Sequence, residues 1–252
     1  MGVKSYILND NEFLHNGIFI NKFMPLERAL NILNSNKIWF ANPETWTDPY
    51  EKKFICAKYE NGRSFAWRNR VFCTCFTNNA ASEASWNAYS KDEICIQLTF
   101  YRTELIKVFE QYINANPHNQ MYFDKVEYMQ SKNINKSLSS IPFNPQISHG
   151  KSIQSMEFKA RLLLLKRRAF EYEQEYRAII VKPKATKERG INVDIHDIHD
   201  LISSITIGPK VREDTFNMMK SIFVGKYGFN PKSIKQSHLY KSLPNDTIIK
   251  LK

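Results

Sequence analysis

The chain has 252 residues, of which 42% are hydrophobic and 13% aromatic. This is enough apolar material to bury a core, so the composition excludes an intrinsically disordered protein. No apolar run approaches the roughly 20 residues that span a bilayer, and Met1–Tyr6 lacks the apolar core of a signal peptide. We therefore expect a cytoplasmic protein that does not bind membranes.

Charge is the strongest bulk signal. The 36 Lys and Arg residues outnumber the 25 Asp and Glu residues, which gives a formal net charge of +11, and most of the basic excess lies in the C-terminal half. A positive field attracts phosphate polyanions such as RNA, DNA or a dinucleotide. A lysine-rich surface that is merely solvated has the same composition, so the charge suggests a class of partner without naming one.

The cysteines fit a reducing compartment. Cys73 and Cys75 are two residues apart, which on a strand places both on one side and prevents a bridge between them. The sequence contains no CxxC pair, so it favours reduced thiols and predicts no zinc site.

Strand and helix patterns alternate along the chain. We expect strands at 17–23, 37–41, 54–59, 70–76, 94–100, 173–181, 204–209 and 247–251. We expect helices that begin at Pro25 and Ser82, and others at 104–113, 155–168 and 213–223. Residues 42–49 and 130–150 have the composition of loops. No linker divides the chain, so we predict one α+β domain over residues 1–252, with mixed, mostly antiparallel sheets and flanking helices.

Several catalytic classes lack their motifs. GxGxxG, GxxxxGK[ST], GxSxG and HExxH are all missing, so phosphate-binding loops, nucleophile elbows and zinc proteases are not supported. His196 and His199 lie three residues apart, a spacing that suits a shared metal on a helix face. The alternative, which we favour, is that the repeated Asp-Ile-His tract caps a helix start above buried Ile195, Ile198 and Leu201. We therefore predict no metal.

The most informative segment is Lys166–Arg177. On an extended chain Glu173, Glu175 and Arg177 point to one face, in steps of about 6–7 Å. Two carboxylates beside a fixed cation can have their pKa values pushed apart, which suits acid–base catalysis or stabilisation of a cation. The same pattern also suits a structural ion-pair network at the start of a strand, and the spacing does not decide between the two.

Three ordered blocks carry a family resemblance. The first comprises Lys22-Phe23, the helix Arg28–Leu33, Ile38–Pro43 and Trp46–Glu51. The second comprises Phe72–Thr77, Trp86–Tyr89 and Ile94–Ile96. The third comprises Lys166, Phe170, Glu173, Glu175, Tyr176 and Arg177, with Ile205–Pro209 after it. In these blocks the chain resembles the bacterial domain-of-unknown-function family 2971, except that Thr47 stands where that family usually has Asn.

A second, more distant resemblance concerns the order of motifs. ADP-ribosyltransferases have a basic residue on an early strand, a Ser/Thr strand and a Glu-x-Glu motif opening a later strand. Lys22, the strand containing Thr74, and Glu173-Gln174-Glu175 occur here in that order. The resemblance implies a split-sheet fold and NAD as co-substrate. It assigns Glu175 to stabilising an oxocarbenium ion and Glu173 to the acceptor, with Arg177 beside them.

The remaining cofactor contacts follow from the same hypothesis. Trp86 or Tyr89 would stack on nicotinamide, and Asp48 and Glu51 would approach the same open cleft as Glu173 and Glu175. Lys22 is a departure, because its ammonium cannot hydrogen-bond a ribose as His or Arg does.

Three functional hypotheses follow. The leading one is an ADP-ribosyltransferase or NAD glycohydrolase with a nucleic-acid or protein acceptor, and a small enzyme of this kind would suit a bacterial toxin or a phage-defence effector. The first alternative is an effector that binds or cleaves nucleic acid through Lys166, Arg167, Arg168, Lys182, Lys184 and Lys187. The second is a non-catalytic interaction module in which Glu173, Glu175 and Arg177 are purely structural. The oligomeric state is not predicted.

Overall fold

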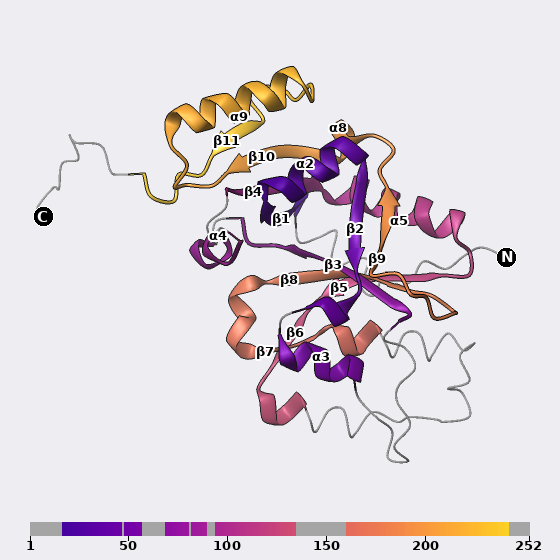
Figure 1. Ribbon diagram of the computed structural model, residues 1–252. Helices are drawn as coiled ribbons and strands as arrows, with labels where there is room; N and C mark the ends of the chain where they lie inside the picture. Colours follow the sequence, from indigo (N-terminus) through magenta and orange to yellow (C-terminus); the bar gives the residue numbers. More distant parts are fainter. Residues whose placement is uncertain are drawn as a thin grey trace, which may run out of the picture.

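The computed structural model describes residues 17–46, 48–56, 69–80, 82–89, 94–134 and 160–241 (Figure 1). Within these residues, nine strands form one sheet and two short parallel strands form a second. The strands are β1 (Phe19–Pro25), β2 (Lys37–Ala41), β3 (Val71–Thr77), β4 (Cys95–Tyr101), β5 (Gln120–Lys125), β6 (Glu127–Met129), β7 (Leu165–Arg167), β8 (Glu175–Val181), β9 (Gly190–Asp194), β10 (Ile202–Ile207) and β11 (Ile234–Gln236). The helices are α2 (Leu26–Ser35), α3 (Pro49–Cys56), α4 (Glu83–Tyr89), α5 (Arg102–Ala115), α8 (Ile198–Leu201) and α9 (Glu213–Gly225), with 3-10 helices η1 (Pro43–Thr45) and η2 (Arg168–Glu173).

The main sheet divides beside β3. Its strand order is β11-β10-β4-β1-β3-β2-β9, and β3 also pairs with β8, which pairs with β5. Every ladder is antiparallel except that of β10 with β11. Over the described residues β3 meets β1 at one pair, Asn21 with Thr77, and β2 at one pair, Ala41 with Cys73. By contrast, β3 and β8 pair along their whole length from Val71–Val181 to Thr77–Glu175. The strands therefore diverge on either side of β3.

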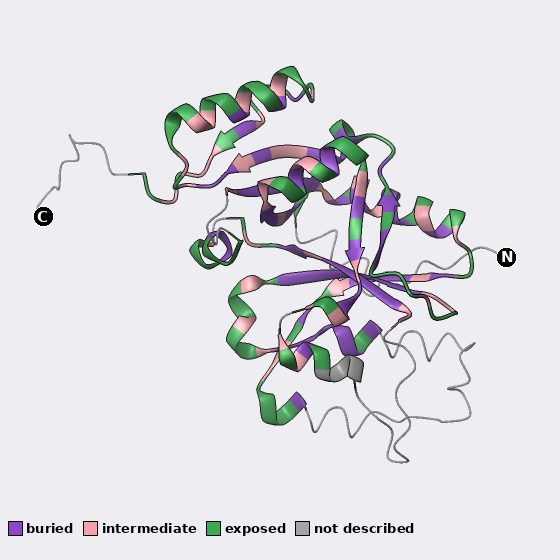
Figure 2. Cartoon of the chain, in the orientation of Figure 1, coloured by how far each residue is buried: buried purple, intermediate pink, exposed green. Residues whose placement is uncertain are grey.

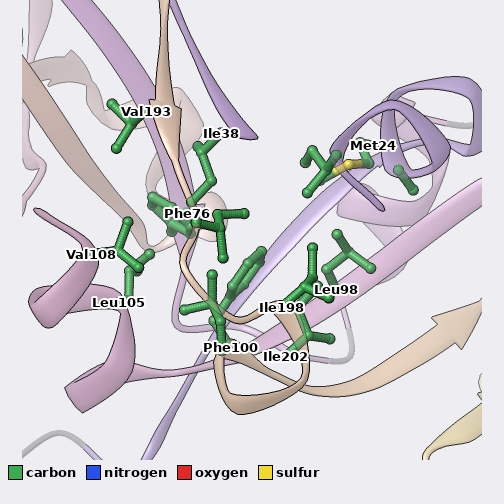
Figure 3. Packing of buried hydrophobic residues seen from close by; sticks show 14 of the residues in the cluster. Met24, Ile38, Phe76, Leu98, Phe100, Leu105, Val108, Val193, Ile198 and Ile202 are labelled. Carbon is green, nitrogen blue, oxygen red and sulfur yellow. The ribbon is translucent and has the colours of Figure 1, made fainter. Parts of the chain in front are cut away.

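The core lies on one face of this sheet. Phe76 makes edge contacts with Phe100, Phe109 and Phe123, at centroid distances of 5.6, 6.4 and 5.8 Å. Figure 3 shows Phe76 and Phe100 packed among aliphatic side chains from β2, β4, α5, β9 and α8. Burying such side chains is the main favourable term in folding, at about 1.5–3 kcal/mol each.

The strand β8 is buried on both faces (Figure 2). Tyr176, Ala178 and Ile180 face the main core. On the opposite face Ile179 and Val181 join a second apolar cluster with the run Leu162–Leu165. Strand alternation places Glu175 and Arg177 on that same second face. One face of β8 therefore changes from charged to apolar along its length.

Most predicted elements are present. The α+β class and the mostly antiparallel sheet are confirmed. Ser82 accepts a hydrogen bond from the Ser85 N–H at 3.2 Å, as predicted for the start of α4. Asp197 likewise caps α8 by accepting from the His199 and Asp200 N–H groups. Among the cysteines whose side chains the structure describes, Cys73 and Cys95 are buried free thiols and Cys75 is a half-buried one.

Two element predictions are wrong. The strand at 54–59 is wrong because α3 continues to Cys56, while 57–59 lie outside the described residues. The helix at 155–168 is wrong at its end, because 165–167 form β7 and η2 begins at Arg168. The apolar run Leu162–Leu165 gives no periodicity that separates a buried strand from a buried helix. The predicted strand at 247–251 and most of the loop at 130–150 lie outside the described residues.

None of the described helices is both long enough and apolar enough to cross a bilayer. The single-domain assignment for residues 1–252 stays a prediction.

Candidate functional site

The site is built around a bidentate ion pair on β8. Arg177 donates from Nε to Glu175 Oε1 and from Nη2 to Glu175 Oε2, both at 2.9 Å. Its Nη1 donates to the Leu163 carbonyl at 2.6 Å, and Nη2 also bonds Glu51 of α3. The guanidinium thus joins β8 to the chain at Leu163, 14 residues earlier, and to α3, where Glu51 lies 126 residues earlier.

Lys166 of β7 connects Glu173, the second predicted carboxylate, to this ion pair. Its Nζ lies 2.6 Å from Glu173 Oε2, 3.0 Å from Glu175 Oε2 and 3.9 Å from Glu51 Oε1. We call Glu51, Lys166, Glu173, Glu175 and Arg177 the charged cluster. Three carboxylates share two cations, so the cluster carries a formal excess of one negative charge.

A sharp turn, and not an extended chain, places the two carboxylates. Glu173 is the last residue of η2, and Gln174 has a φ of 42° in the left-handed region. The prediction that Glu173 lies on the strand is therefore wrong, whereas Glu175 and Arg177 do share one face of β8. The Glu175 N–H donates to the Tyr128 hydroxyl at 2.8 Å, which fixes the start of the strand. The turn folds Glu173 back onto Lys166.

Every member of the charged cluster except Glu173 is buried, which corrects the expected open cleft. Arg177 is 1% exposed, Glu175 5% and Lys166 8%. Burial of charge is expensive unless each charge is paired and hydrogen-bonded. The contacts within the cluster supply that compensation.

The two carboxylates have opposite pKa shifts. Burial alone would raise the pKa of Glu175, but Arg177 and Lys166 outweigh it and lower that pKa to about 2. Burial raises the pKa of Glu173, and Lys166 offsets only part of this effect. The side chain of Glu173 is 29% exposed, against 6% for Glu175. Glu175 is thus held ionised, while Glu173 is the member of the pair that meets solvent.

Aromatic rings surround the cations. Arg177 lies 4.6 Å from the Trp46 ring centroid. Arg167 lies 4.7 Å from the Tyr50 ring and 5.0 Å from the Phe170 ring, and its Nη2 contacts Asp48 at 3.1 and 3.2 Å. Cation–π contacts of this kind stabilise partly desolvated cations. Asp48 therefore approaches the site through Arg167, while Glu51 enters it directly.

Helix α4 covers the face of the sheet on which Glu175 and Arg177 lie. The Phe23 ring stacks with Tyr89 at 6.5 Å and meets Trp86 edge-on at 4.8 Å. Burial raises the pKa of Tyr89, and Cys75 and the Glu175 and Glu173 carboxylates raise it further. Helix α4 also contacts η2, which ends at Glu173. Tyr89 is 41% exposed, whereas Trp86 is 2% exposed. Of the two predicted stacking residues, Tyr89 is the one available beside the cluster.

Lys22 and Thr74 bond to each other. Lys22 Nζ donates to Thr74 Oγ1 at 2.8 Å and to the Cys75 carbonyl at 2.6 Å, across the gap where β1 and β3 diverge. Thr74 pairs with Ala178, so it points to the face of β3 opposite to Glu175. These two predicted cofactor-binding residues therefore use their polar groups to bridge the divided sheet.

The six basic residues of the nucleic-acid hypothesis are dispersed. Lys166 and Arg167 belong to the site just described, and Lys182 pairs with Glu188 at 2.9 Å. Arg168, Lys184 and Lys187 are exposed. Among the described residues, no group of three or more His, Cys, Asp or Glu side chains could hold a metal ion.

Sequence reasoning missed three contributors to the site. Trp46 lies in a family block, but its sequence context does not predict a contact with Arg177. Lys166 is predicted to bind nucleic acid, whereas the structure pairs it with carboxylates of the charged cluster. Tyr128 gave no signal at all. Charged and aromatic residues are interspersed in Trp46–Glu51, and this is the sequence pattern that could have predicted a charged partner for the loop.

Comparison with known proteins identifies part of the chain. Residues 85–178 match the family described as "Protein of unknown function (DUF2971)". The predicted resemblance to this family is confirmed over that segment, which runs from α4 into β8. The DUF2971 match includes Tyr89, Lys166, Glu173, Glu175 and Arg177, whereas Lys22, Asp48, Glu51 and Thr74 lie before it. No curated protein and no solved structure gives a significant match.

Proposed function

We propose that this chain cleaves the nicotinamide–ribose bond of NAD and transfers ADP-ribose to water or to an acceptor. The observation that carries the proposal is the pair of neighbouring carboxylates on one ammonium, one buried and ionised and the other partly exposed with a raised pKa. Environments that push two carboxyl pKa values apart are typical of sites that divide charge stabilisation from proton transfer.

The chemistry assigns a role to each carboxylate. The bond between the nicotinamide nitrogen and the ribose C1′ breaks, and its electron pair leaves with nicotinamide. The ribose then develops an oxocarbenium ion, which the fixed negative charge of Glu175 stabilises. When an acceptor hydroxyl attacks C1′, Glu173 takes its proton; when water attacks instead, its proton passes to bulk water.

The surrounding residues fit this substrate. The exposed Tyr89 ring beside Phe23 offers a stacking surface for nicotinamide. Arg177 and Lys166 hold Glu175 in one orientation through three hydrogen bonds, so its charge costs no reorganisation during the reaction.

The test compares NAD turnover by wild type, Glu175→Gln, Glu173→Gln and Glu171→Gln. Glu171 is exposed on η2 and pairs with Arg168, so it is the matched control. We expect Glu175→Gln to lower turnover per folded molecule by a factor on the order of 10² or more. Glu173→Gln should reduce transfer to an acceptor more than NAD hydrolysis, and Glu171→Gln should change neither.

Activity must be measured per folded molecule, because Glu175 is buried and its substitution also destabilises the fold. Circular dichroism gives the folded fraction at the assay temperature. Equal turnover per folded molecule in wild type and Glu175→Gln would overturn the proposal and favour a purely structural cluster.

A further inference from the structure

A second candidate site is a pocket beside Trp86, separate from the charged cluster. It has a volume of about 300 Å³ and is lined by α4, the start of β4, the β10–α9 connection, the first turn of α9 and Tyr240. None of its lining residues belongs to the charged cluster. In Figure 1, α4 lies between the part of the molecule that contains α9 and the part that contains β8.

The inner wall of this pocket is apolar. Trp86, Ile94, Cys95, Pro209 and Val211 form it. Trp86 and Cys95 are each 2% exposed, and Gly208 brings the backbone close, since a Cβ there would lie 3.2 Å from the Cys95 carbonyl. The Trp86 indole N–H has no hydrogen-bond partner among the described residues. A buried donor without an acceptor is unusual in a folded protein.

The rim of the pocket is positive. Lys210 contacts two neutral groups, the Asn87 amide oxygen at 3.4 Å and the Tyr240 ring at 5.5 Å. Arg212 is the N-cap of α9, and its side chain does not cap the N–H groups of the first turn. The helix dipole adds a partial positive charge at this end.

Acidic groups near the rim are already engaged or point outward. Glu83 accepts from the Tyr240 hydroxyl at 2.7 Å. Asp214 pairs with Arg212 at 3.4 Å, with both side chains more than four-fifths exposed. Glu213 in the same first turn is also exposed and does not line the pocket. Arg212 is paired with Asp214, so the positive field in the pocket comes mainly from Lys210 and the helix end, and a bound anion would compete with Asp214 for Arg212.

We propose that this pocket binds a small aromatic carboxylate. Its ring would lie against Trp86 and Val211, and its carboxylate would meet Lys210, Arg212 and the first turn of α9. A volume of about 300 Å³ suits a ligand of one or two fused rings. The proposal does not depend on the NAD reaction, because the two sites share no residue.

The experiment is a calorimetric titration with 2-naphthoate and with its neutral isostere 2-naphthamide. We expect the anion to bind about tenfold more tightly, because hydrogen bonds to an ionised acceptor are roughly twice as strong as neutral ones and each 1.4 kcal/mol corresponds to a tenfold change in affinity. Lys210→Gln with Arg212→Gln should remove this preference and leave naphthamide binding unchanged. Lys220 lies on the same helix outside the pocket, so Lys220→Gln should change neither the preference for the anion nor the binding of naphthamide.

Two further measurements locate the ligand. Thr215→Phe fills the pocket and should abolish binding of both compounds, and the variant's circular dichroism shows whether it folds. Independently, the indole N–H resonance of Trp86, assigned with Trp86→Phe, should shift on titration in the wild type. No binding at about millimolar concentration, equal affinity for the two isosteres, or an unmoved Trp86 resonance would each overturn the proposal.

Discussion

At the scale of single residues, the Glu175–Arg177 pair is the feature whose loss should cost most. Both side chains are almost fully buried, and each depends on the other for compensation of its charge. Removing one partner leaves an unpaired charge in a low-dielectric site, which costs about 3–5 kcal/mol in comparable proteins. Lys166 also contacts Glu175, and Glu51 also contacts Arg177, but neither contact replaces the bidentate pair between Glu175 and Arg177.

This coupling predicts a pH dependence of stability. The folded pKa of Glu175 is about 2, below the value of about 4.3 for an unfolded Glu. The ionised carboxylate therefore stabilises the fold fully above about pH 4, and this stabilisation is lost as pH falls toward 2. We expect a loss of roughly 3 kcal/mol across that window, measured by urea denaturation at a series of pH values.

The variant Glu175→Gln provides the comparison. It should be less stable than wild type at pH 7, and its stability should change less between pH 4 and pH 2. The raised pKa of Glu173 acts in the opposite sense at slightly higher pH, since protonation of that group favours the folded state. Parallel stability profiles of wild type and Glu175→Gln below pH 4 would contradict this assignment.

At the scale of elements, the turn between η2 and β8 determines whether the two carboxylates meet. Gln174 has φ 42° and ψ 51°, a conformation that costs an L-residue roughly 1 kcal/mol and glycine very little. Its side chain is exposed, and its N–H bonds the Glu171 carbonyl while its carbonyl accepts from the Asn78 N–H. Substitutions here test the turn without removing a side-chain contact of the cluster.

We expect Gln174→Gly to stabilise the fold by about 0.5–1 kcal/mol and Gln174→Val to destabilise it by at least about 1 kcal/mol. Gln174→Asn should fall between these two, because asparagine tolerates left-handed backbone. Chemical denaturation measures the order. If valine and glycine variants were equally stable, the turn would not be held in this conformation in solution.

The elements also show what the sequence can predict. Periodicity was sufficient for α2, α5 and α9, where apolar side chains recur along one face, and for β4. It failed at Leu162–Leu165, where a buried run lacks periodicity, and at Glu173, where a left-handed residue ends the extended chain. The pairing of Glu175 with Arg177 was predictable from alternation. The contacts of Glu51, Trp46 and Tyr128 were not, because they depend on how distant segments pack.

At the scale of the whole molecule, the divided sheet separates two regions. On one side, β8, β7, η2 and α3 carry the charged cluster, and on the other, the β10–α9 connection and the first turn of α9 line the second pocket together with α4 and the start of β4. Helix α4 contacts both regions, since Trp86 lines the pocket and the helix also contacts η2, which ends at Glu173. A single helix therefore connects the two proposed ligand sites.

The net charge of +11 creates a positive electrostatic field around the whole molecule. We expect the protein to bind a labelled single-stranded RNA at low salt, with an affinity that falls steeply as salt rises, because each phosphate contact releases counterions. Among the basic residues first assigned to nucleic acid, Arg168, Lys184 and Lys187 are the exposed ones. Reversing these three charges should weaken binding and reduce the slope of log affinity against log salt by about 2.

The control variant reverses the charge of three other exposed lysines. Lys226, Lys232 and Lys235 are also exposed, from the end of α9 to β11, and their reversal lowers the net charge equally. If the first set forms the contact surface, its reversal weakens binding more than that of the control set. Equal weakening by both sets would indicate a diffuse field with no defined contact surface, and a flat salt dependence would exclude the nucleic-acid hypothesis and leave the basic excess as surface solvation.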